Sequence, residues 1–240
     1  MHLFEETSRP VIFEYENADF PYWGKGSSLL LANSQHYFWI TAAHVLTNMG
    51  GSVQTLRIFP SDHSRISLPF NEQYTIKKRL SEHEDYKDIF ALRINLQEFE
   101  EFGDTPLVAQ DVGLGLLPAE ELTLDDELWV IGYPAESNFI DYDCGRIRNT
   151  RSVIRAIYKG PSISDHCHKA KIDSSIRLTT YDGLSCSPVF YMRSQIHDWR
   201  EVRFPLLAVM LLRGTVSSSL VHFVSASVIG SLIHLAGSNA

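Results

Sequence analysis

The chain has 240 residues, of which 44% are hydrophobic and 21% charged, a composition typical of a globular protein and not of a disordered or fibrous one. Its formal net charge is −8 at pH 7, so the overall basic surface of a nucleic-acid-binding protein is excluded and no nucleic-acid partner is expected. The N-terminus lacks the basic segment and apolar stretch of a secretion signal, and no apolar run approaches the roughly 20 residues that span a bilayer. We therefore expect neither secretion nor a membrane partner.

Short apolar runs separated by Gly, Pro, Asn, Asp and Ser dominate the chain. They predict strands at 11–13, 28–31, 37–40, 56–59, 89–94, 128–131, 153–158 and 206–212. Many short strands with turn formers between them are typical of an all-β sandwich or barrel. Residues 227–235 instead carry apolar side chains at helical spacing before Gly237, which predicts a terminal helix at about 226–236 packed on the second half of the protein.

An acidic segment at 98–104 is followed by Thr105-Pro106 and then by a stretch rich in Gly and Leu. Such a shift in composition is typical of a solvated connection between two structural units. We therefore predict one domain over residues 1–110 and a second over residues 111–240.

Three segments carry side chains that together could form a nucleophilic site. His44 follows an apolar strand in WITAAHVL, Asp88 stands at the entry to another in YKDIFAL, and Ser185 lies in the glycine-led turn DGLSCSPVF. A serine hydroxyl is a poor nucleophile at neutral pH unless a base takes its proton. An imidazole titrates in the right range for that task, and a carboxylate can hold its tautomer. Each residue alone would be interpreted as a packed histidine, a turn former or a loop residue.

These segments resemble the motifs of the trypsin-like (chymotrypsin-fold) serine peptidases. TAAHVL is similar to the family's histidine motif, DIFAL to its aspartate motif and GLSCSPVF to its G-x-S-G-[GS]-P serine motif, in the chain order His, Asp, Ser. Weaker likeness appears in WGKGS at 23–27 and VIGYP at 130–134. The resemblance implies an all-β fold of two six-stranded antiparallel β-barrels of the chymotrypsin type with a C-terminal α-helix. His44 and Asp88 would belong to the first barrel and Ser185 to the second.

The resemblance also implies an activity. The chain would be a serine endopeptidase that forms an acyl-enzyme at Ser185, with His44 as general base and Asp88 as the carboxylate that orients it. The backbone N–H groups of Gly183 and Ser185 would form the oxyanion hole, in which glycine takes an unusual backbone conformation at little cost. The partner would be a protein or peptide substrate, and no cofactor or metal is needed because the site supplies its own base and donors.

The serine motif departs from the family at two positions. Cys186 stands where the family has glycine; as a nucleophile it would move Gly183 out of register, so Ser185 is the predicted nucleophile and Cys186 a small buried residue. Leu184 replaces the aspartate that pairs with a new N-terminus in zymogen-activated members. The chain is therefore expected to be competent as made or to be switched by an activating protein partner. Two alternatives stay open: a catalytically silent trypsin-like scaffold that acts as a protein-binding module, and an esterase with the same triad.

Alignment with the family indicates which residues would bind substrate. Thr179 and Thr180 would line the primary specificity pocket, with Leu211 and Gly214 in the facing wall. A threonine instead of an acid at 179 argues against cleavage after Lys or Arg, so a small or mid-sized apolar side chain is expected. A shift of the alignment would return His222 to this pocket.

The cysteines bear on compartment and on metals. The chain has three cysteines, Cys144, Cys167 and Cys186, which is an odd number, and they show no CxxC spacing. We therefore expect no disulfide framework and a reducing, cytoplasmic compartment. This location suggests an intracellular processing or effector protease. The run at 166–168, His-Cys-His, has no second cluster to complete a zinc site and is predicted to be a loop.

Overall fold

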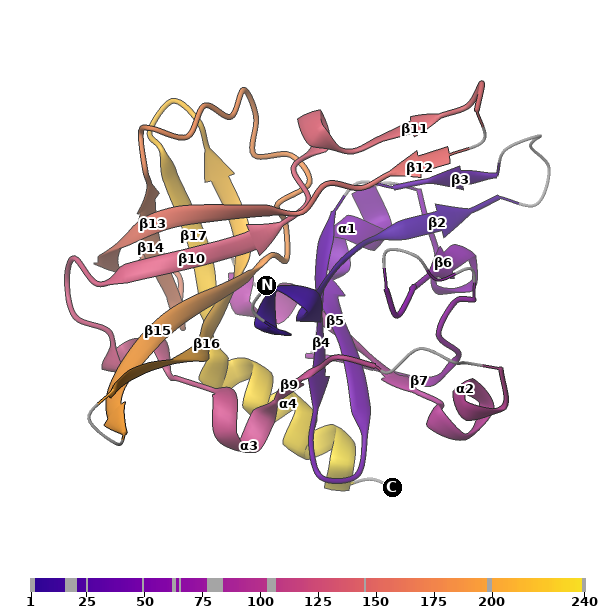
Figure 1. Cartoon of the computed structure of the whole chain (residues 1–240), viewed down its shortest axis with the longest axis horizontal. Coiled ribbons are helices and arrows are strands. Elements are labelled where there is room, and N and C mark those ends of the chain that lie inside the picture. Colours follow the sequence, from indigo (N-terminus) through magenta and orange to yellow (C-terminus); the bar gives the residue numbers. More distant parts are fainter. Residues whose placement is uncertain are drawn as a thin grey trace.

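The computed structural model describes residues 3–15, 21–24, 26–48, 50–61, 64, 66–76, 84–102, 107–144, 146–197 and 200–238. Within these ranges most of the regular structure is antiparallel strand, and the one long helix, α4 (Ala226–Ser238), lies at the C-terminal end (Figure 1). The predicted all-β class with a C-terminal helix is confirmed. No helix in this described part is both long enough and apolar enough to span a bilayer.

The second half of the chain forms a closed six-stranded barrel (Figure 1). In chain order its strands are β10 (Glu127–Gly132), β13 (Ser152–Pro161), β14 (Cys167–Ile172), β15 (Pro188–His197), β16 (Arg200–Thr215) and β17 (Leu220–Ser225). They pair in the order β10-β13-β14-β17-β16-β15, and every pairing is antiparallel. Buried and more exposed residues alternate along much of β13, because one face of the strand points into the barrel core.

The first half repeats this strand order. Its strands are β1 (Ser8–Pro10), β2 (Ile12–Glu14), β3 (Tyr22–Trp23), β4 (Ser27–Ala32), β5 (Tyr37–Ala42), β6 (Leu56–Arg57), β7 (Phe70–Thr75) and β8 (Ile89–Ile94). One sheet runs β1-β4-β5-β8-β7, and a second sheet runs β3-β2-β6. If β1 and β2 are taken as one strand interrupted at Val11, the neighbours correspond to those of the second barrel.

The first barrel was expected to close like the second, but its closure is looser. No ladder joins β6 to β7 among the described residues. Between these strands the Leu68 N–H donates to the Ile58 carbonyl at 2.6 Å. A short parallel strand, β9 (Gln110–Asp111), also pairs with β4, so this half is not wholly antiparallel. Together the two halves are consistent with a chymotrypsin-like two-barrel fold.

The remaining elements are short. They are α1 (Ala43–Asn48), α2 (Leu96–Phe102), α3 (Val112–Gly115), the hairpin strands β11 (Phe139–Asp141) and β12 (Arg146–Arg148), and the 3-10 turns η1 (Leu3–Thr7), η2 (Val53–Thr55), η3 (Asp85–Asp88), η4 (Ala119–Glu121) and η5 (Ala135–Ser137). Two of them matter for the site, because α1 begins one residue before His44 and η3 ends at Asp88.

Helix α4 packs on both halves, which is broader than the predicted packing on the second barrel. Its buried residues Val228, Ile229, Leu232 and Ile233 belong to the same core cluster as the side chains of β4 and β5. The helix contacts β7 as well as β16 and β17. In Figure 1 it runs from beneath β16 toward the turn between β4 and β5. The helix therefore packs against strands of both halves.

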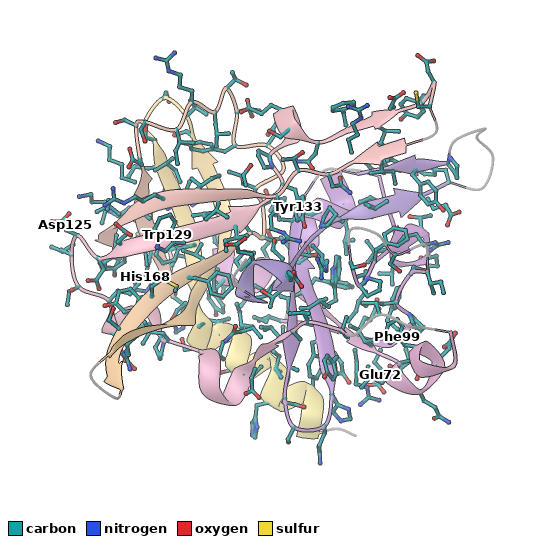
Figure 2. All side chains as sticks on the ribbon, viewed as in Figure 1. Glu72, Phe99, Asp125, Trp129, Tyr133 and His168 are labelled. Carbon is teal, nitrogen blue, oxygen red and sulfur yellow. The ribbon has the colours of Figure 1, made fainter. Side chains whose placement is uncertain are left out.

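His168 is a buried polar residue inside the second barrel (Figure 2). Its Nδ1 shares a hydrogen bond of 2.7 Å with the Tyr158 hydroxyl, and its ring stacks on Phe223 with 5.8 Å between centroids. Burial lowers the pKa of His168 because it disfavours the imidazolium, and the Glu120 carboxylate partly opposes this shift. Folding therefore shifts this histidine toward its neutral form.

The lowered pKa of His168 predicts a loss of stability in acid. As the pH falls below the ordinary histidine pKa of 6.5, the unfolded chain binds a proton that the folded chain does not, so the free energy of unfolding decreases. We expect His168→Gln to reduce this decrease between about pH 7.5 and about pH 5.5, measured by denaturant unfolding. Part of the dependence of the free energy of unfolding on pH remains in the variant, because burial also lowers the pKa of His222. An unchanged slope in a folded variant contradicts the prediction.

Candidate active site

His44 and Asp88 are brought together by two neighbouring strands of the first half. His44 follows β5 and Asp88 precedes β8, and these strands pair antiparallel with Ala42 opposite Ile89, so both side chains lie at one end of the sheet. The Asp88 carboxylate accepts a hydrogen bond from His44 Nδ1 and another, of 3.0 Å, from the His44 backbone N–H. The carboxylate thus orients the ring and leaves Nε2 as the nitrogen that can act as a base.

Ser185 lies in the turn that leads into β15, and this turn is bound to the first half. The Ser27 N–H donates to the Ser185 carbonyl at 2.9 Å, and the Ser27 hydroxyl donates to the Gly183 carbonyl at 2.7 Å. Ser27 begins β4, which pairs with β5, the strand that leads to His44. The structure therefore brings the three predicted segments to one seam between the halves.

The Ser185 side chain is half-buried and is not hydrogen-bonded to His44. Within the described part of the chain its hydroxyl forms no hydrogen bond at all. In ligand-free active sites such bonds are often long and tighten only when substrate binds. The geometry therefore supplies an oriented histidine with a serine turn docked beside it.

The turn before Ser185 requires a glycine. Gly183 has a φ of +86°, and a Cβ there would lie 2.3 Å from the Tyr133 carbonyl oxygen and 2.7 Å from the Ala135 nitrogen. Among the described residues, the N–H groups of Gly183 and Ser185 donate to no acceptor. Unpaired backbone donors of this kind are what an oxyanion hole requires.

Cys186 is buried behind the turn and is only 1% exposed. Its φ of +67° falls in the left-handed region, which explains why glycine suits this position in the motif. The thiol contacts the Thr41 side chain and the Ala42 backbone and lies near Asp88. Burial raises the pKa of Cys186 well above its ordinary value, and the Asp88 carboxylate adds to the shift. A protonated, inaccessible thiol is a poor nucleophile, which favours Ser185.

Two of the predicted specificity residues, Thr179 and Thr180, have side chains that form hydrogen bonds. Thr179 is exposed, and both its N–H, at 2.9 Å, and its hydroxyl donate to the carboxylate of Glu136 in η5. The Thr180 hydroxyl accepts from the Asp182 N–H at 3.1 Å. Thr179 is thus held against η5.

At Gly214, predicted for the facing wall, Tyr181 and Val221 are the nearest side chains. A Cβ on Gly214 would lie 2.8 Å from Tyr181 Cδ2, and the Tyr181 hydroxyl is hydrogen-bonded to Ser219 in the turn after β16. Sequence reasoning missed Tyr181, although its place between Thr180 and Gly183 could have indicated it. Leu211 lies in β16 opposite Phe223, but its side chain is outside the described residues.

His222 and the 166–168 run lie elsewhere on the second barrel. His222 in β17 pairs with Lys169 of β14, and its Nδ1 shares a 3.0 Å hydrogen bond with the Ser162 hydroxyl. Cys167 and His168 begin strand β14 and are buried, so the predicted loop is limited to the turn at His166. The described residues include no group of three or more His, Cys, Asp or Glu that could hold a metal ion.

Comparisons with known proteins add little to this geometry. No protein-family model matches the chain. No curated protein matches it. Among solved structures, the chain is similar to Rv3671c from M. tuberculosis H37Rv, crystallised as a serine-to-alanine mutant in an inactive form, with 13% identity over 98% of this chain and 88% of that one and a TM-score of 0.46. A likeness of this size says nothing about activity.

The environments of the three cysteines predict one reactive thiol. Cys144 is exposed in the turn between β11 and β12, whereas Cys167 and Cys186 are buried. Burial raises the pKa of Cys167 to about 12, so it too stays protonated. Iodoacetamide should alkylate Cys144 alone in the native protein and all three cysteines after denaturation, measured by peptide mass spectrometry. Rapid native labelling of Cys186 would contradict its placement.

Proposed function

We propose that the protein is a serine-type endopeptidase, a trypsin-like peptidase that cleaves peptide bonds through an acyl-enzyme at Ser185. The observation that carries the proposal is the hydrogen-bonded pair of His44 and Asp88 beside the docked Ser185 turn. The oriented imidazole is the base that a serine nucleophile needs. The backbone N–H groups of Gly183 and Ser185 would stabilise the negative charge that develops on the substrate oxygen.

In the proposed reaction Ser185 Oγ bonds to the carbonyl carbon of the substrate while its proton passes to His44 Nε2. The carbonyl oxygen becomes an oxyanion that accepts hydrogen bonds from the N–H groups of Gly183 and Ser185, each worth roughly 3–4 kcal/mol in such sites. The carbon–nitrogen bond then breaks, and His44 returns its proton to the leaving amine. Water repeats the sequence on the ester and releases the acid. Asp88 accepts the Nδ1 hydrogen throughout and stabilises the imidazolium.

Apolar packing supports the proposal that the chain is competent as made. Leu184, next to the nucleophile, is fully buried in the core of the second barrel. Its burial provides an anchor for the turn that does not depend on an ion pair with a new N-terminus. An activating protein partner is the alternative means of control.

A cytoplasmic location and a role as an intracellular processing or effector protease are part of the proposal. The three cysteines are free thiols, a state that a reducing compartment maintains. The protein or peptide substrate is the proposed partner.

Labelling by a fluorophosphonate probe tests the nucleophile. The native protein should become covalently labelled, and Ser185→Ala should abolish labelling because the attacking oxygen is gone. Ser217→Ala, a matched change at an exposed serine in the turn after β16, should leave labelling unchanged. A folded native protein that takes no label would favour the catalytically silent scaffold. Peptide and ester substrates assayed side by side separate a peptidase from an esterase.

Asp88→Asn tests the orienting carboxylate. The amide keeps an oxygen for the His44 backbone N–H but presents the wrong partner to Nδ1, so the ring takes the unproductive tautomer. We expect kcat to fall by about 10⁴-fold while the free energy of unfolding changes little. Steady-state kinetics and denaturant unfolding measure the two effects. A loss of less than about tenfold would contradict the assigned role.

A further inference from the structure

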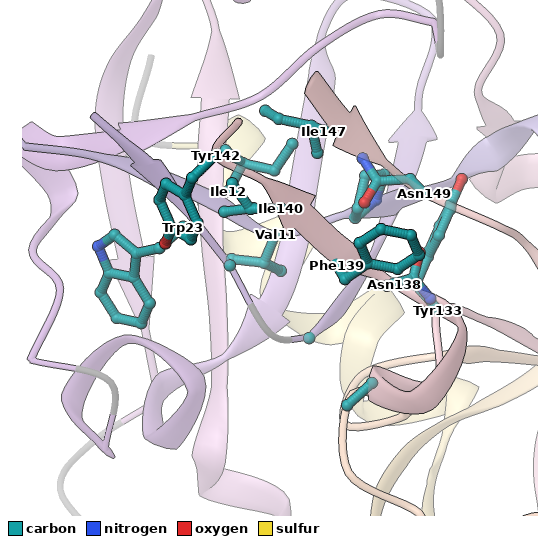
Figure 3. Close-up of a pocket in the computed structure, with 14 residues that line it drawn as sticks. Val11, Ile12, Trp23, Tyr133, Asn138, Phe139, Ile140, Tyr142, Ile147 and Asn149 are labelled. Carbon is teal, nitrogen blue, oxygen red and sulfur yellow. The ribbon is translucent and has the colours of Figure 1, made fainter. Parts of the chain in front are cut away.

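A cavity of about 280 Å³ lies where the β11–β12 hairpin of the second half meets strands of the first half (Figure 3). In Figure 1 this hairpin runs alongside β2 and β3. The lining is mostly apolar and includes Val11, Ile12 and Trp23 on one side and Phe139, Ile140 and Ile147 on the other. Engineered cavities of about 150 Å³ hold a benzene ring, so this one has room for an aromatic or large aliphatic side chain.

The walls of the cavity are fixed by contacts of their own. The Trp23 ring stacks with those of Phe13 and Tyr15, at 4.8 and 5.4 Å between centroids. On the hairpin, Ile140 and Ile147 are directly paired across the two strands. A preformed apolar site spends little binding energy on ordering its own side chains.

The hairpin base is also held in place. The Asn138 side chain donates to the Pro134 carbonyl at 2.6 Å and accepts from the Thr150 N–H at 2.7 Å. The bond to Thr150 joins the two ends of the hairpin, and the bond to Pro134 ties the first end to the segment before it.

The cavity adjoins both the oxyanion turn and the helix of His44. Tyr133 and Ala135 line it, and their backbone atoms are those that a Cβ on Gly183 would meet. Gly26 also lines it, and a Cβ there would lie 2.8 Å from the side chain of Val45, the residue after His44. The cavity therefore shares lining residues with the surroundings of Gly183 and of Val45, the residue after the base.

This position indicates which part of a substrate the cavity meets. In acyl transfer the histidine that takes the serine proton returns it to the leaving amine, so the leaving segment lies on the histidine's side of the bond. At Gly214, in the predicted primary specificity pocket, the side chains of Val221 and Tyr181 already occupy the close approach. Room for a large side chain is thus found beside the leaving segment.

We propose that this cavity binds a bulky apolar side chain of the substrate, at the first or second residue after the cleaved bond. The inference rests on the proposed function and adds the substrate class: peptides selected by an aromatic or large aliphatic residue in the leaving segment. Selection is made by shape and burial of apolar surface, since most of the lining is apolar.

Capture of the acyl-enzyme by amines tests the proposal. The protein is acylated with p-nitrophenyl acetate, and phenylalaninamide, Gly-Phe-amide or Gly-Gly-amide competes with water for the acyl group. The amine nitrogen bonds to the acyl carbon, the ester bond to Ser185 Oγ breaks, and the amine proton returns through His44 to that oxygen. We expect at least one of the phenylalanine amides to capture the acyl group about tenfold more efficiently than Gly-Gly-amide, or better.

Substitutions in the cavity test whether the preference for phenylalanine amides arises there. Ile147→Trp fills the space and should remove the phenylalanine advantage, while Ile163→Trp, the same change at a residue 82% exposed outside the cavity, should keep it. Ile147→Ala removes apolar contact from the cavity without adding bulk, so it should lower the advantage of the phenylalanine amides. It provides a second test in case Ile147→Trp fails to fold. Equal capture of all three amides by the native protein, or a preference that Ile147→Trp and Ile147→Ala both leave intact, overturns the inference.

A binding measurement separates this inference from the proposed function. Saturation-transfer NMR on Ser185→Ala protein, which needs no turnover, should detect Gly-Phe-amide or phenylalaninamide and lose the signal in the double variant with Ile147→Trp. If the native protein takes neither fluorophosphonate nor acetyl group but this binding is seen, the proposed function fails and the cavity stands as an apolar side-chain site. If no binding is detected and the three amines capture the acyl group equally, the inference about the cavity is rejected and the proposed function is not.

Discussion

The buried hydrogen bonds of Ser27 determine how the two halves of this protein meet. Its hydroxyl donates to the Gly183 carbonyl and accepts from the Tyr133 N–H, and its own N–H donates to the Ser185 carbonyl. Ser27 is fully buried, and leaving such groups without partners in a low-dielectric interior costs about 1–3 kcal/mol each. These hydrogen bonds therefore hold the turn that carries Ser185 against the start of β4.

The seam is closed by small residues. A Cβ on Gly132 would lie 1.8 Å from Ser187 Oγ and 2.8 Å from Ser27 Oγ, so the backbone of β10 approaches closely only because this position is glycine. Next to it the Ser8 hydroxyl donates to the Ile131 carbonyl at 3.0 Å. Short side chains satisfy backbone groups across the seam without holding the halves apart. This close approach brings the serine turn of one half to the histidine and aspartate of the other.

Much of the fold follows from local pattern, and the omissions have physical reasons. Apolar runs such as 28–31 and 89–94 are buried strands, β4 and β8, because continuous apolar sequence needs burial on both faces. Strand β7 was missed because Phe70–Thr75 is a polar edge strand with only alternate residues half-buried. Strand β14 was missed because its inward His168 finds a polar partner in Tyr158, which makes a histidine acceptable inside a barrel.

The sequence by itself determined the kinds of chemical group at the site and their order along the chain, because a nucleophile, a base and a glycine-led turn leave local signatures. Only the tertiary structure decided that His44 is hydrogen-bonded to Asp88, that Cys186 is buried, and that Tyr181 lies against Gly214. The apolar cavity between Trp23 and the β11–β12 hairpin likewise belongs to neither half alone. The physical reason is that contacts between residues far apart in sequence depend on strand register and on the fit of the seam, which no local stretch of sequence encodes.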